Sequence, residues 1–499
     1  MHHLPDQKQF VRTYDTGAPQ LVWSAFLTDL ETPVSAMLKL MPASPYHLLF
    51  ESVEGGETRA RYSIIALNPD ILWRCTEAGA ELSRSGKPED FTPDGSDAFA
   101  SLRRLLAETA LAIPPELPPM AAGLFGYMGY DMVKRMERLS DKNPETIGIP
   151  QAMYMRPRIT VIFDSVKDEA TIITPVYPNP GVDAAAAYKS ACGRIEEVAE
   201  RLNANLERSI FSRYYAGGMD TRAEVASHTT REDYHAMVRK AKEYIAAGDI
   251  FQVVPSRRFT RPFAHPPMAF YRALRHLNPS PYLFMMGMGG FTIVGSSPEI
   301  LVRLREGVVT IRPIAGTRKR GVNPAEDKAL EAELLADQKE LAEHLMLLDL
   351  GRNDVGRVAK TGTVRVTERM VIERYSHVMH IVSNVEGELR PDKDCFDALI
   401  AGFPAGTVSG APKIRAMEII DELEKEKRSF YGGTVGYISA NGSMDTCIAL
   451  RTGLIKDGTL YLQAGGGVVA DSDPEAEYQE TQNKANALIA AANDAGRFV

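Results

Sequence analysis

Three β-rich runs near the C-terminus, joined by tight-turn dipeptides, constrain the fold of this chain more than any other feature. The runs span residues 431–439, 444–451 and 459–464, with Asn441-Gly442 and Asp457-Gly458 at the turns. Both dipeptides tolerate the positive φ angles of hairpin turns. Consecutive hairpins make an antiparallel meander, so we expect an α+β protein with large antiparallel β-sheets flanked by helices, not a doubly wound parallel sheet.

The first half of the chain is also predicted to be sheet-based. A helix is expected from about residue 184 to 206, and the polar, aperiodic stretch 209–229 is typical of a connector. We therefore predict two domains, residues 1–225 and 226–499. Short β-rich runs between turn residues predict strands in the first domain at 47–51, 61–67, 71–76, 158–164 and 170–176.

The second domain is expected to open with a helix. Thr230 and Asp233 resemble a capping box, and apolar residues follow helical spacing until Gly248, a natural helix end. A strand is predicted next, over residues 250–259.

Charge and composition exclude several classes of protein. The 499 residues carry a formal net charge of −8, which argues against nucleic-acid binding because phosphate affinity needs clustered Lys and Arg. The N-terminus lacks the apolar core of a signal peptide, and the longest apolar stretch, residues 282–295, is short and interrupted by glycine. We expect a cytoplasmic protein with no membrane segment. The four scattered cysteines form no Cys-x-x-Cys pair, which disfavours disulfides and thiolate zinc sites.

Two Glu-x-x-Glu pairs are candidate metal ligands: Glu340 with Glu343, and Glu477 with Glu480. A spacing of three puts both carboxylates of a pair on one helical face, where they repel each other. Mg²⁺ would relieve that repulsion, since it binds a few carboxylate oxygens and keeps waters or substrate oxygens. The alternative is two solvated helix faces, because one lysine lies four residues before Glu343 and another four after Glu480.

Two glycine-rich segments are candidates for close contact with a ligand. Residues 404–424 predict a turn entering a helix, with Ser409 as a possible cap and Pro412 near the first helical position. Free N–H groups there could hold an anion, although an ordinary capped helix start is the alternative. The triple glycine 465–467 opens no helix at the offset of a dinucleotide fingerprint, which favours a bulge or a close backbone approach.

Histidine and arginine supply the remaining candidates. His377 and His380 lack a third ligand at zinc-site spacing, so a structural role and a role in proton transfer both stay open. Arg451 lies within an apolar run, where it needs either solvent on its face or an anionic partner.

Ten motifs, in order, cover nearly all of residues 230–490 and resemble the chorismate-binding domain of anthranilate synthase large subunits. Three shorter motifs, LLFES, RARYSIIAL and AAGLFGYMGYD, are similar to the N-terminal domain of the same family. The resemblance implies the anthranilate synthase large-subunit fold. The ten are GDIFQVVPSRRF, NPSPYLF, GSSPEILVR, RPIAGTRKRG, KELAEHLMLLDLGRND, SHVMHIVS, PAGTVSGAPKIRAM, YGGTVGYIS, DTCIALRT and QAGGGVVADSDPEAEYQET.

The resemblance also implies a reaction. Chorismate and ammonia give aminodeoxyisochorismate, which loses pyruvate to leave anthranilate for tryptophan biosynthesis. Glu343 and Glu480 match the family's Mg²⁺ ligands, with Glu340 and Glu477 as companion carboxylates. Glu299 matches the general acid for the leaving hydroxyl, and His380 and Thr407 match the other catalytic positions. The matching substrate-binding residues are Gly316, Thr317, Tyr431, Arg451, Gly465, Gly466 and Gly467.

Two positions distinguish this chain from relatives on the same scaffold. Isochorismate and salicylate synthases carry a water-activating Lys where this chain has Gln252, whose uncharged amide suits ammonia as the nucleophile. Aminodeoxychorismate synthase carries a nucleophilic Lys where this chain has Ala315. That enzyme is the second interpretation, and a catalytically inactive, tryptophan-sensing subunit is the third.

The resemblance further implies regulation and a partner. Five residues match the family's tryptophan inhibitor site, with departures from the usual pattern at Phe50 and Leu283. The chain contains no glutaminase motif, so free ammonia is its expected nitrogen source. Glutamine would serve only through a separate amidotransferase subunit, in a heterotetramer by family expectation. The five residues are Glu51, Ser52, Pro281, Tyr282 and Leu283.

Overall fold

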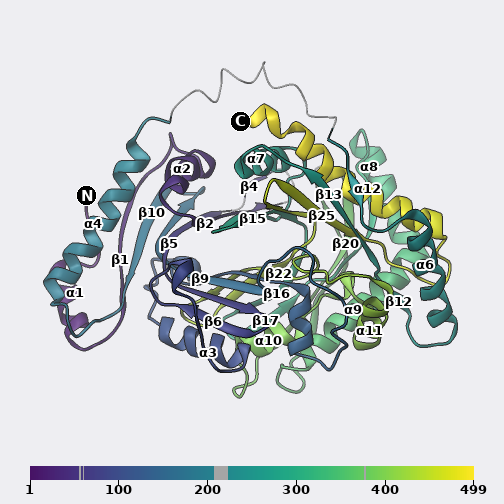
Figure 1. Ribbon diagram of the computed structural model, residues 1–499, viewed down its shortest axis with the longest axis horizontal. Helices are drawn as coiled ribbons and strands as arrows, with labels where there is room; N and C mark the ends of the chain where they lie inside the picture. The colour runs from purple at the N-terminus through teal and green to yellow at the C-terminus, as the bar shows by residue number, and fades with distance from the viewer. Residues whose placement is uncertain (55–57, 60, 207–222, 376–377) are drawn as a thin grey trace.

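Two stacked antiparallel sheets dominate the structure, with helices on their outer faces (Figure 1). The computed structural model describes residues 1–54, 58–59, 61–206, 223–375 and 378–499. Within these ranges, 21 strands form one antiparallel network. The predicted fold class, an α+β protein with large antiparallel sheets, is confirmed.

The first sheet runs from β1 to β11 across both halves of the chain. Its central pairing joins β2 to β14, with Phe284 opposite Phe50. In spatial order it contains β1 (Gln20–Leu27), β10 (Glu169–Val176), β9 (Ala152–Asp164), β5 (Tyr62–Thr76), β2 (Tyr46–Glu51), β14 (Tyr282–Met288), β15 (Phe291–Ser297), β24 (Thr452–Lys456), β25 (Thr459–Gly465), β13 (Ser256–Pro262) and β11 (Ala226–Ser227).

The second sheet shares β5 and β9 with the first. These two long strands pass from one sheet to the other, and their pairing is irregular between Pro69 and Ile71. Beyond them the sheet contains β7 (Thr92–Pro93) and β6 (Gly79–Ser83) on one side, then β8 (Gly123–Met128), β22 (Thr434–Ser439), β23 (Met444–Ile448), β16 (Ile300–Arg305), β17 (Val308–Ile311), β20 (Val378–Glu388), β18 (Ile314–Lys319) and β19 (Arg365–Arg374) on the other.

The C-terminal half crosses between the sheets at two further points. Between β15 and β16 the chain passes through Glu299, and between β23 and β24 it passes through Arg451, which has a φ of 48°. The run predicted as one strand, 444–451, is therefore a strand only over β23; its last three residues form the crossing, and β24 begins at Thr452 in the other sheet. The predicted strand 250–259 is likewise split, into β12 (Gln252–Val253), which pairs with β21 (Gly410–Ala411), and β13.

Helices cover both outer faces. In Figure 1, α2, α7 and α12 lie above the upper sheet and α3 and α10 below the lower one, while α1 and α4 flank β1 and β10. None of the described helices is long and apolar enough to cross a membrane. The helices are α1 (Gln7–Asp15), α2 (Pro33–Leu40), α3 (Ala98–Thr109), α4 (Ala184–Asn203), α6 (Arg231–Ala246), α7 (Pro267–Leu277), α8 (Pro324–Ala336), α9 (Gln338–Gly356), α10 (Cys395–Gly402), α11 (Lys413–Leu423) and α12 (Pro474–Asp494).

Three large apolar clusters correspond to the three interfaces between these layers. One packs the first sheet against α1, α2, α4, α7 and α12, and another packs the second sheet against α3, α9 and α10. The third fills the space between the sheets and includes Leu48, Phe125 and Ile293. Each cluster draws on both halves of the chain, and most of the predicted connector, its residues 209–222, lies outside the described part. The boundary at residue 225 stays a prediction.

Two helix starts test the capping expectations. Thr230 caps α6 by accepting the N–H of Asp233 at 3.1 Å, and Gly248, with a φ of 82°, follows the helix end as predicted. Ser409 does not cap α11, because its hydroxyl donates to the carbonyl of Ala405 at 2.8 Å. Pro412 stands at the N-cap position instead.

Candidate active site

Glu299 is a buried carboxyl at one crossing between the sheets. Its neighbours Pro298 and Ile300 line a cavity between the sheets, while Glu299 lines a small cavity on the side of Thr407. The Thr407 hydroxyl donates to Oε2 of Glu299 at 3.1 Å. Burial raises the pKa of Glu299 to about 8, against the hydrogen bonds from Thr407 and the backbone of Ile314. Glu299 therefore holds a proton at neutral pH and can donate it.

His380 lies opposite Thr317 where β18 pairs with β20. The pairing is irregular at Gly316, whose φ of 77° turns the strand so that its carbonyl faces the imidazole. His380 Nδ1 lies 3.1 Å from that carbonyl and 3.0 Å from the Thr317 hydroxyl. A carbonyl only accepts, so Nδ1 carries the proton and Nε2 is left as a base. Burial lowers the pKa of His380 to about 4, which keeps the ring neutral.

The two Glu-x-x-Glu pairs lie on two helices, α9 and α12, and each carboxylate has a different partner. Glu343 accepts the amide of Gln252 at 3.0 Å. Glu480 pairs with Lys484 at 2.7 Å, as the solvated-face alternative predicted. The remaining two are bonded as follows: Glu340 to Arg318 at 3.2 Å and Glu477 to the hydroxyl of Ser472 at 2.7 Å.

Electrostatics show that the two helices bring these carboxylates near one another. Burial raises the pKa of Glu343, and the charges of Glu340 and Glu480 add to the shift. Burial likewise raises the pKa of Glu477, with Glu480 contributing. Oε2 of Glu477 is buried without a hydrogen-bond partner. Such crowded, desolvated carboxylates suit a divalent cation.

No ready-made metal cage is present among the described residues. Across 1–54, 58–59, 61–206, 223–375 and 378–499, no three His, Cys, Asp or Glu side chains converge closely enough to hold an ion. The donor set nevertheless fits Mg²⁺, which is commonly held by one or two carboxylates together with waters and substrate oxygens. His377, the other histidine considered above, lies outside the described residues.

The triple glycine 465–467, which begins at the last residue of β25, lets three side chains approach its backbone. A Cβ on Gly465 would lie 2.9 Å from the hydroxyl of Tyr431, and one on Gly467 would lie 2.6 Å from the amide nitrogen of Gln252. A Cβ on Gly466 would lie 2.9 Å from the unpartnered oxygen of Glu477. Any larger residue would displace these groups, so the glycines bring a tyrosine, an amide and a carboxylate to one strip of backbone.

Arg451 is a partly buried cation with no anionic partner in the described part of the chain. Burial lowers the pKa of its guanidinium, and the electrostatic effect of Tyr375 partly opposes that shift. Its charge also contributes to the lowered pKa of His380, so the two side chains are close. A desolvated arginine without a carboxylate is a candidate site for an anionic substrate group.

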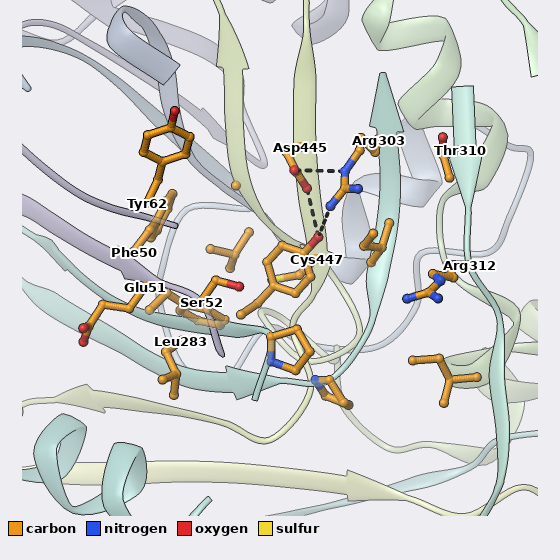
Figure 2. A pocket seen from close by; sticks show the side chains of 18 of the residues that line it. Phe50, Glu51, Ser52, Tyr62, Leu283, Arg303, Thr310, Arg312, Asp445 and Cys447 are labelled. Carbon is orange, nitrogen blue, oxygen red and sulfur yellow. Dashed lines mark hydrogen bonds and ion pairs between the residues drawn. The ribbon is translucent and has the colours of Figure 1, made fainter. Parts of the chain in front are cut away.

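A second candidate site is the cavity of about 1170 Å³ between the two sheets (Figure 2). Ser52, Pro281, Tyr282 and Leu283 line it together with β22 and β23. Asp445 lies within it, bonded to the Tyr282 hydroxyl at 3.0 Å and to two arginines of β16, Arg303 at 3.1 Å and Arg305 at 2.7 Å.

Glu51 also lies at this cavity, but its carboxylate is used within the protein. Figure 2 shows the side chain directed away from the cavity centre, whereas the hydroxyl of Ser52 points into it. The Glu51 carboxylate pairs with Arg275 at 2.8 Å and accepts the hydroxyl of Tyr271 at 2.5 Å, both from α7. Ser52 is therefore the member of this pair with a side chain free to meet a ligand.

Three residues next to the site were not in the predicted set. Tyr375 packs its ring against His380 with centroids 5.6 Å apart, and Arg428 lies 5.7 Å from the ring of Tyr431. The sequence identifies Gln252 only as a position that distinguishes this chain from relatives on the same scaffold. Arg428 belongs to the charged run EKEKR, a pattern typical of a solvated face, so no sequence signal marks its burial.

Sequence comparison relates the whole chain to known proteins. The family described as chorismate binding enzyme matches residues 68–490. Anthranilate synthase component 1 of Cereibacter sphaeroides is 55% identical over 493 residues, covering 98% of each chain. The Pseudomonas aeruginosa protein of the same name is 48% identical over 491 residues, covering 97% of this chain and 98% of the relative.

Solved structures agree with the sequence comparison. Anthranilate synthase component I from Streptococcus pneumoniae superposes with a TM-score of 0.74 at 38% identity, over 86% of this chain and 92% of that one. The menaquinone-specific isochorismate synthase of Escherichia coli superposes with a TM-score of 0.69 over 97% of this chain and 98% of that one. Its identity of 20% shows a shared fold alone.

Proposed function

This chain belongs to the chorismate-binding enzyme family, among the anthranilate synthase component 1 proteins, and we propose that it converts chorismate and ammonia into anthranilate and pyruvate. The observation that carries the proposal is a set of three groups: Glu299, bonded to the Thr407 hydroxyl; His380, whose Nδ1 is held by Gly316 and Thr317; and Arg451, which has no anionic partner among the described residues. One group supplies a proton, one accepts a proton, and the cation can bind a carboxylate.

In the first step, ammonia forms a bond to a ring carbon while the bond to the ring hydroxyl breaks. Glu299 gives its proton to the departing oxygen, which leaves as water, and the ammonium group formed on the ring releases its extra proton to solvent. The hydroxyl of Thr407 then stabilises the carboxylate that remains, since it already donates to Oε2 of Glu299. Gln252 places an uncharged amide beside Glu343, at the position where water-using relatives carry a lysine that activates water. Because the amide cannot activate water in this way, ammonia is the nucleophile.

In the second step, pyruvate is eliminated and the ring becomes aromatic. Nε2 of His380 removes a ring proton while the carbon–oxygen bond to the enolpyruvyl group breaks. The released enolpyruvate takes up a proton to become pyruvate. Gly316 and Thr317 hold Nδ1, so the ring keeps the tautomer that this step needs.

Substrate binding is assigned to the surrounding strands. Arg451 pairs with the pyruvyl carboxylate, and the hydroxyl of Tyr431 and the backbone of residues 465–467 contact the substrate beside it. Glu343 and Glu480 would hold Mg²⁺, with Glu340 and Glu477 nearby. When bound, Mg²⁺ supplies positive charge that holds and neutralises the ring carboxylate of chorismate.

We further propose that tryptophan inhibits the enzyme from the cavity lined by Ser52, Pro281, Tyr282 and Leu283. The apolar walls suit an indole ring, and the Ser52 hydroxyl, which points into the cavity, offers a hydrogen-bonding group to the polar end of the ligand. Glutamine is used through a separate amidotransferase subunit that delivers ammonia, in a heterotetramer, and the assembly is cytoplasmic.

Anthranilate fluorescence from purified protein, chorismate, Mg²⁺ and ammonium tests the proposal directly. We expect anthranilate to form, to disappear with EDTA and to return when Mg²⁺ is added back. Formation of 4-amino-4-deoxychorismate would instead support an aminodeoxychorismate synthase. No turnover, together with tryptophan binding, would support a sensing subunit.

A further inference from the structure

Arg428 lies next to the active site and is buried. Its side chain is 1% exposed, although the preceding residues form a charged run. Nε donates to the Glu424 carboxylate at 2.9 Å, and Nη2 donates to the same carboxylate at 2.6 Å. A buried arginine paired in this bidentate way keeps a fixed orientation.

The remaining donors of Arg428 hold two backbone segments of the site. Nη1 donates to the carbonyl of Val408 at 2.6 Å, and Nη2 donates to the carbonyl of Val254 at 2.6 Å. Val408 directly follows Thr407, which donates to the proposed acid Glu299. Val254 lies two residues after Gln252, in the segment whose amide reaches Glu343.

A third contact reaches the substrate-binding tyrosine. The guanidinium lies 5.7 Å from the ring centroid of Tyr431 and 4.6 Å from that of Tyr130, so it contacts two aromatic rings. The N-terminal half fixes this arrangement, because the N–H of Tyr130 donates to the carbonyl of Ser429 at 2.8 Å and Asp131 accepts the N–H of Ser429 at 2.8 Å. This contact gives the AAGLFGYMGYD motif a role at the active site.

We propose that Arg428 is a positioning residue that fixes Thr407, Gln252 and Tyr431 relative to one another. The inference rests on the proposed function. Lysine has a single ammonium on a flexible stem, so it can pair with Glu424 but cannot hold both carbonyls in the geometry of the planar fork. The substrate would still bind through Arg451 and the metal site, while the proton donor and the amide would be displaced from the reacting atoms.

The experiment compares Arg428→Lys with Arg156→Lys. Arg156 is a matched control in the N-terminal half: it is 9% exposed, pairs with Asp70 at 2.7 Å and lies 4.1 Å from the ring of Tyr177. For Arg428→Lys we expect kcat to fall by about 10- to 100-fold, with KM for chorismate changed by less than about threefold. Arg156→Lys should keep the wild-type kcat even where it lowers the melting temperature equally.

A second readout separates positioning from general loss of structure. The Thr407 hydroxyl lowers the pKa of Glu299, so a displaced Thr407 should move the alkaline limb of kcat to higher pH. If Arg428→Lys does not fold, the double variant R428Q/E424Q replaces the buried ion pair by a neutral pair and is expected to show the same loss of kcat. A folded Arg428 variant with kcat within twofold of Arg156→Lys overturns the proposal, whereas wild-type protein that makes no anthranilate would contradict the proposed function itself.

Discussion

Two buried titratable side chains with opposite pKa shifts underlie the proposed chemistry at the residue scale. Burial disfavours the charged form of any group, so it raises the pKa of Glu299 to about 8 and lowers the pKa of His380 to about 4. Each shift produces the protonation state that the proposed reaction needs. Near neutral pH the Glu299 carboxyl is protonated and the His380 imidazole is uncharged.

The pH dependence follows from these two states. Activity needs protonated Glu299 and neutral His380, so kcat should fall as pH rises through about 8 and as it falls through about 4. Glu299→Gln removes the acidic proton, and we expect kcat to drop by about 100- to 10,000-fold with loss of the alkaline limb. The profile is measured at constant free ammonia. Thr407→Ser, which keeps the hydroxyl, serves as the control, and a Glu299→Gln enzyme within tenfold of wild type would contradict the assignment.

Arg451 gives a prediction in which activity and stability change in opposite directions. Its guanidinium is desolvated and has no carboxylate partner among the described residues. Replacing it by Gln should raise KM for chorismate by about 100-fold, because a substrate carboxylate loses its partner. The melting temperature should stay equal or rise, because a costly buried charge is removed. Steady-state kinetics and thermal unfolding test both halves, and a large fall in melting temperature would instead indicate a structural role.

Most residues of the candidate site could be named from motifs, but their partners could not. A sequence run fixes where Glu299, His380 and Arg451 stand along the chain and says nothing of what lies across a sheet from them. Arg428 illustrates the limit, because a lysine- and glutamate-rich run predicts exposure and the side chain is buried against two carbonyls. The sequence also could not show that the Glu51 carboxylate is bonded to α7, because that contact depends on tertiary packing.

At the scale of elements, the site is built where strands change sheets. Hairpin dipeptides predicted the two C-terminal turns correctly because turn geometry is local, but the predicted continuous meander is wrong, since the two hairpins lie in different sheets. They did not predict the crossing between β23 and β24, where Arg451 has a φ of 48° directly before β24 starts in the other sheet. An apolar run of this length looks like one strand, because burial on either sheet produces the same pattern. The same reason explains the broken strand at residues 250–259.

Three consecutive glycines, residues 465–467, begin at the last residue of β25 and lead to a prediction about this segment. A Cβ on Gly467 would meet the amide nitrogen of Gln252 at 2.6 Å, and that amide is the end of a flexible side chain. We therefore expect Gly467→Ala to fold with little loss of stability while breaking the bond from Gln252 to Glu343. The kcat with ammonia should fall by about tenfold. Gly290→Ala, whose Cβ would meet nothing within 4 Å, is the matched control, and equal kinetics for the two variants would exclude this role for Gln252.

At the scale of the whole molecule, one wall separates the catalytic site from the cavity between the sheets. Pro298 and Ile300, the sequence neighbours of Glu299, line the cavity. Tyr375 also lines it, and its ring packs on His380 with the two ring centroids 5.6 Å apart. The N–H of Ile448, next to the cavity-lining Cys447, donates to the Glu299 carbonyl at 3.1 Å. A ligand that changes the spacing of the two sheets would therefore change the position of the acid and the base together.

Tryptophan should consequently stabilise the folded protein while it inhibits catalysis. A ligand bound only by the folded state, at 100 times its Kd, adds about 2.7 kcal/mol to the free energy of unfolding. We expect the melting temperature to rise with the logarithm of the tryptophan concentration above Kd, and the concentration that gives half of the inhibition to match the Kd derived from this rise. Coupling requires that tryptophan bind the inactive arrangement more tightly than the active one, so saturating chorismate should weaken tryptophan binding by the same factor.

Ser52→Ala should reduce the thermal shift and the inhibition in parallel. Ser101→Ala, at a buried serine that accepts the indole N–H of Trp73 at 2.8 Å, should change neither. A thermal shift that survives in Ser52→Ala while inhibition is lost would place tryptophan elsewhere and assign Ser52 to the coupling alone.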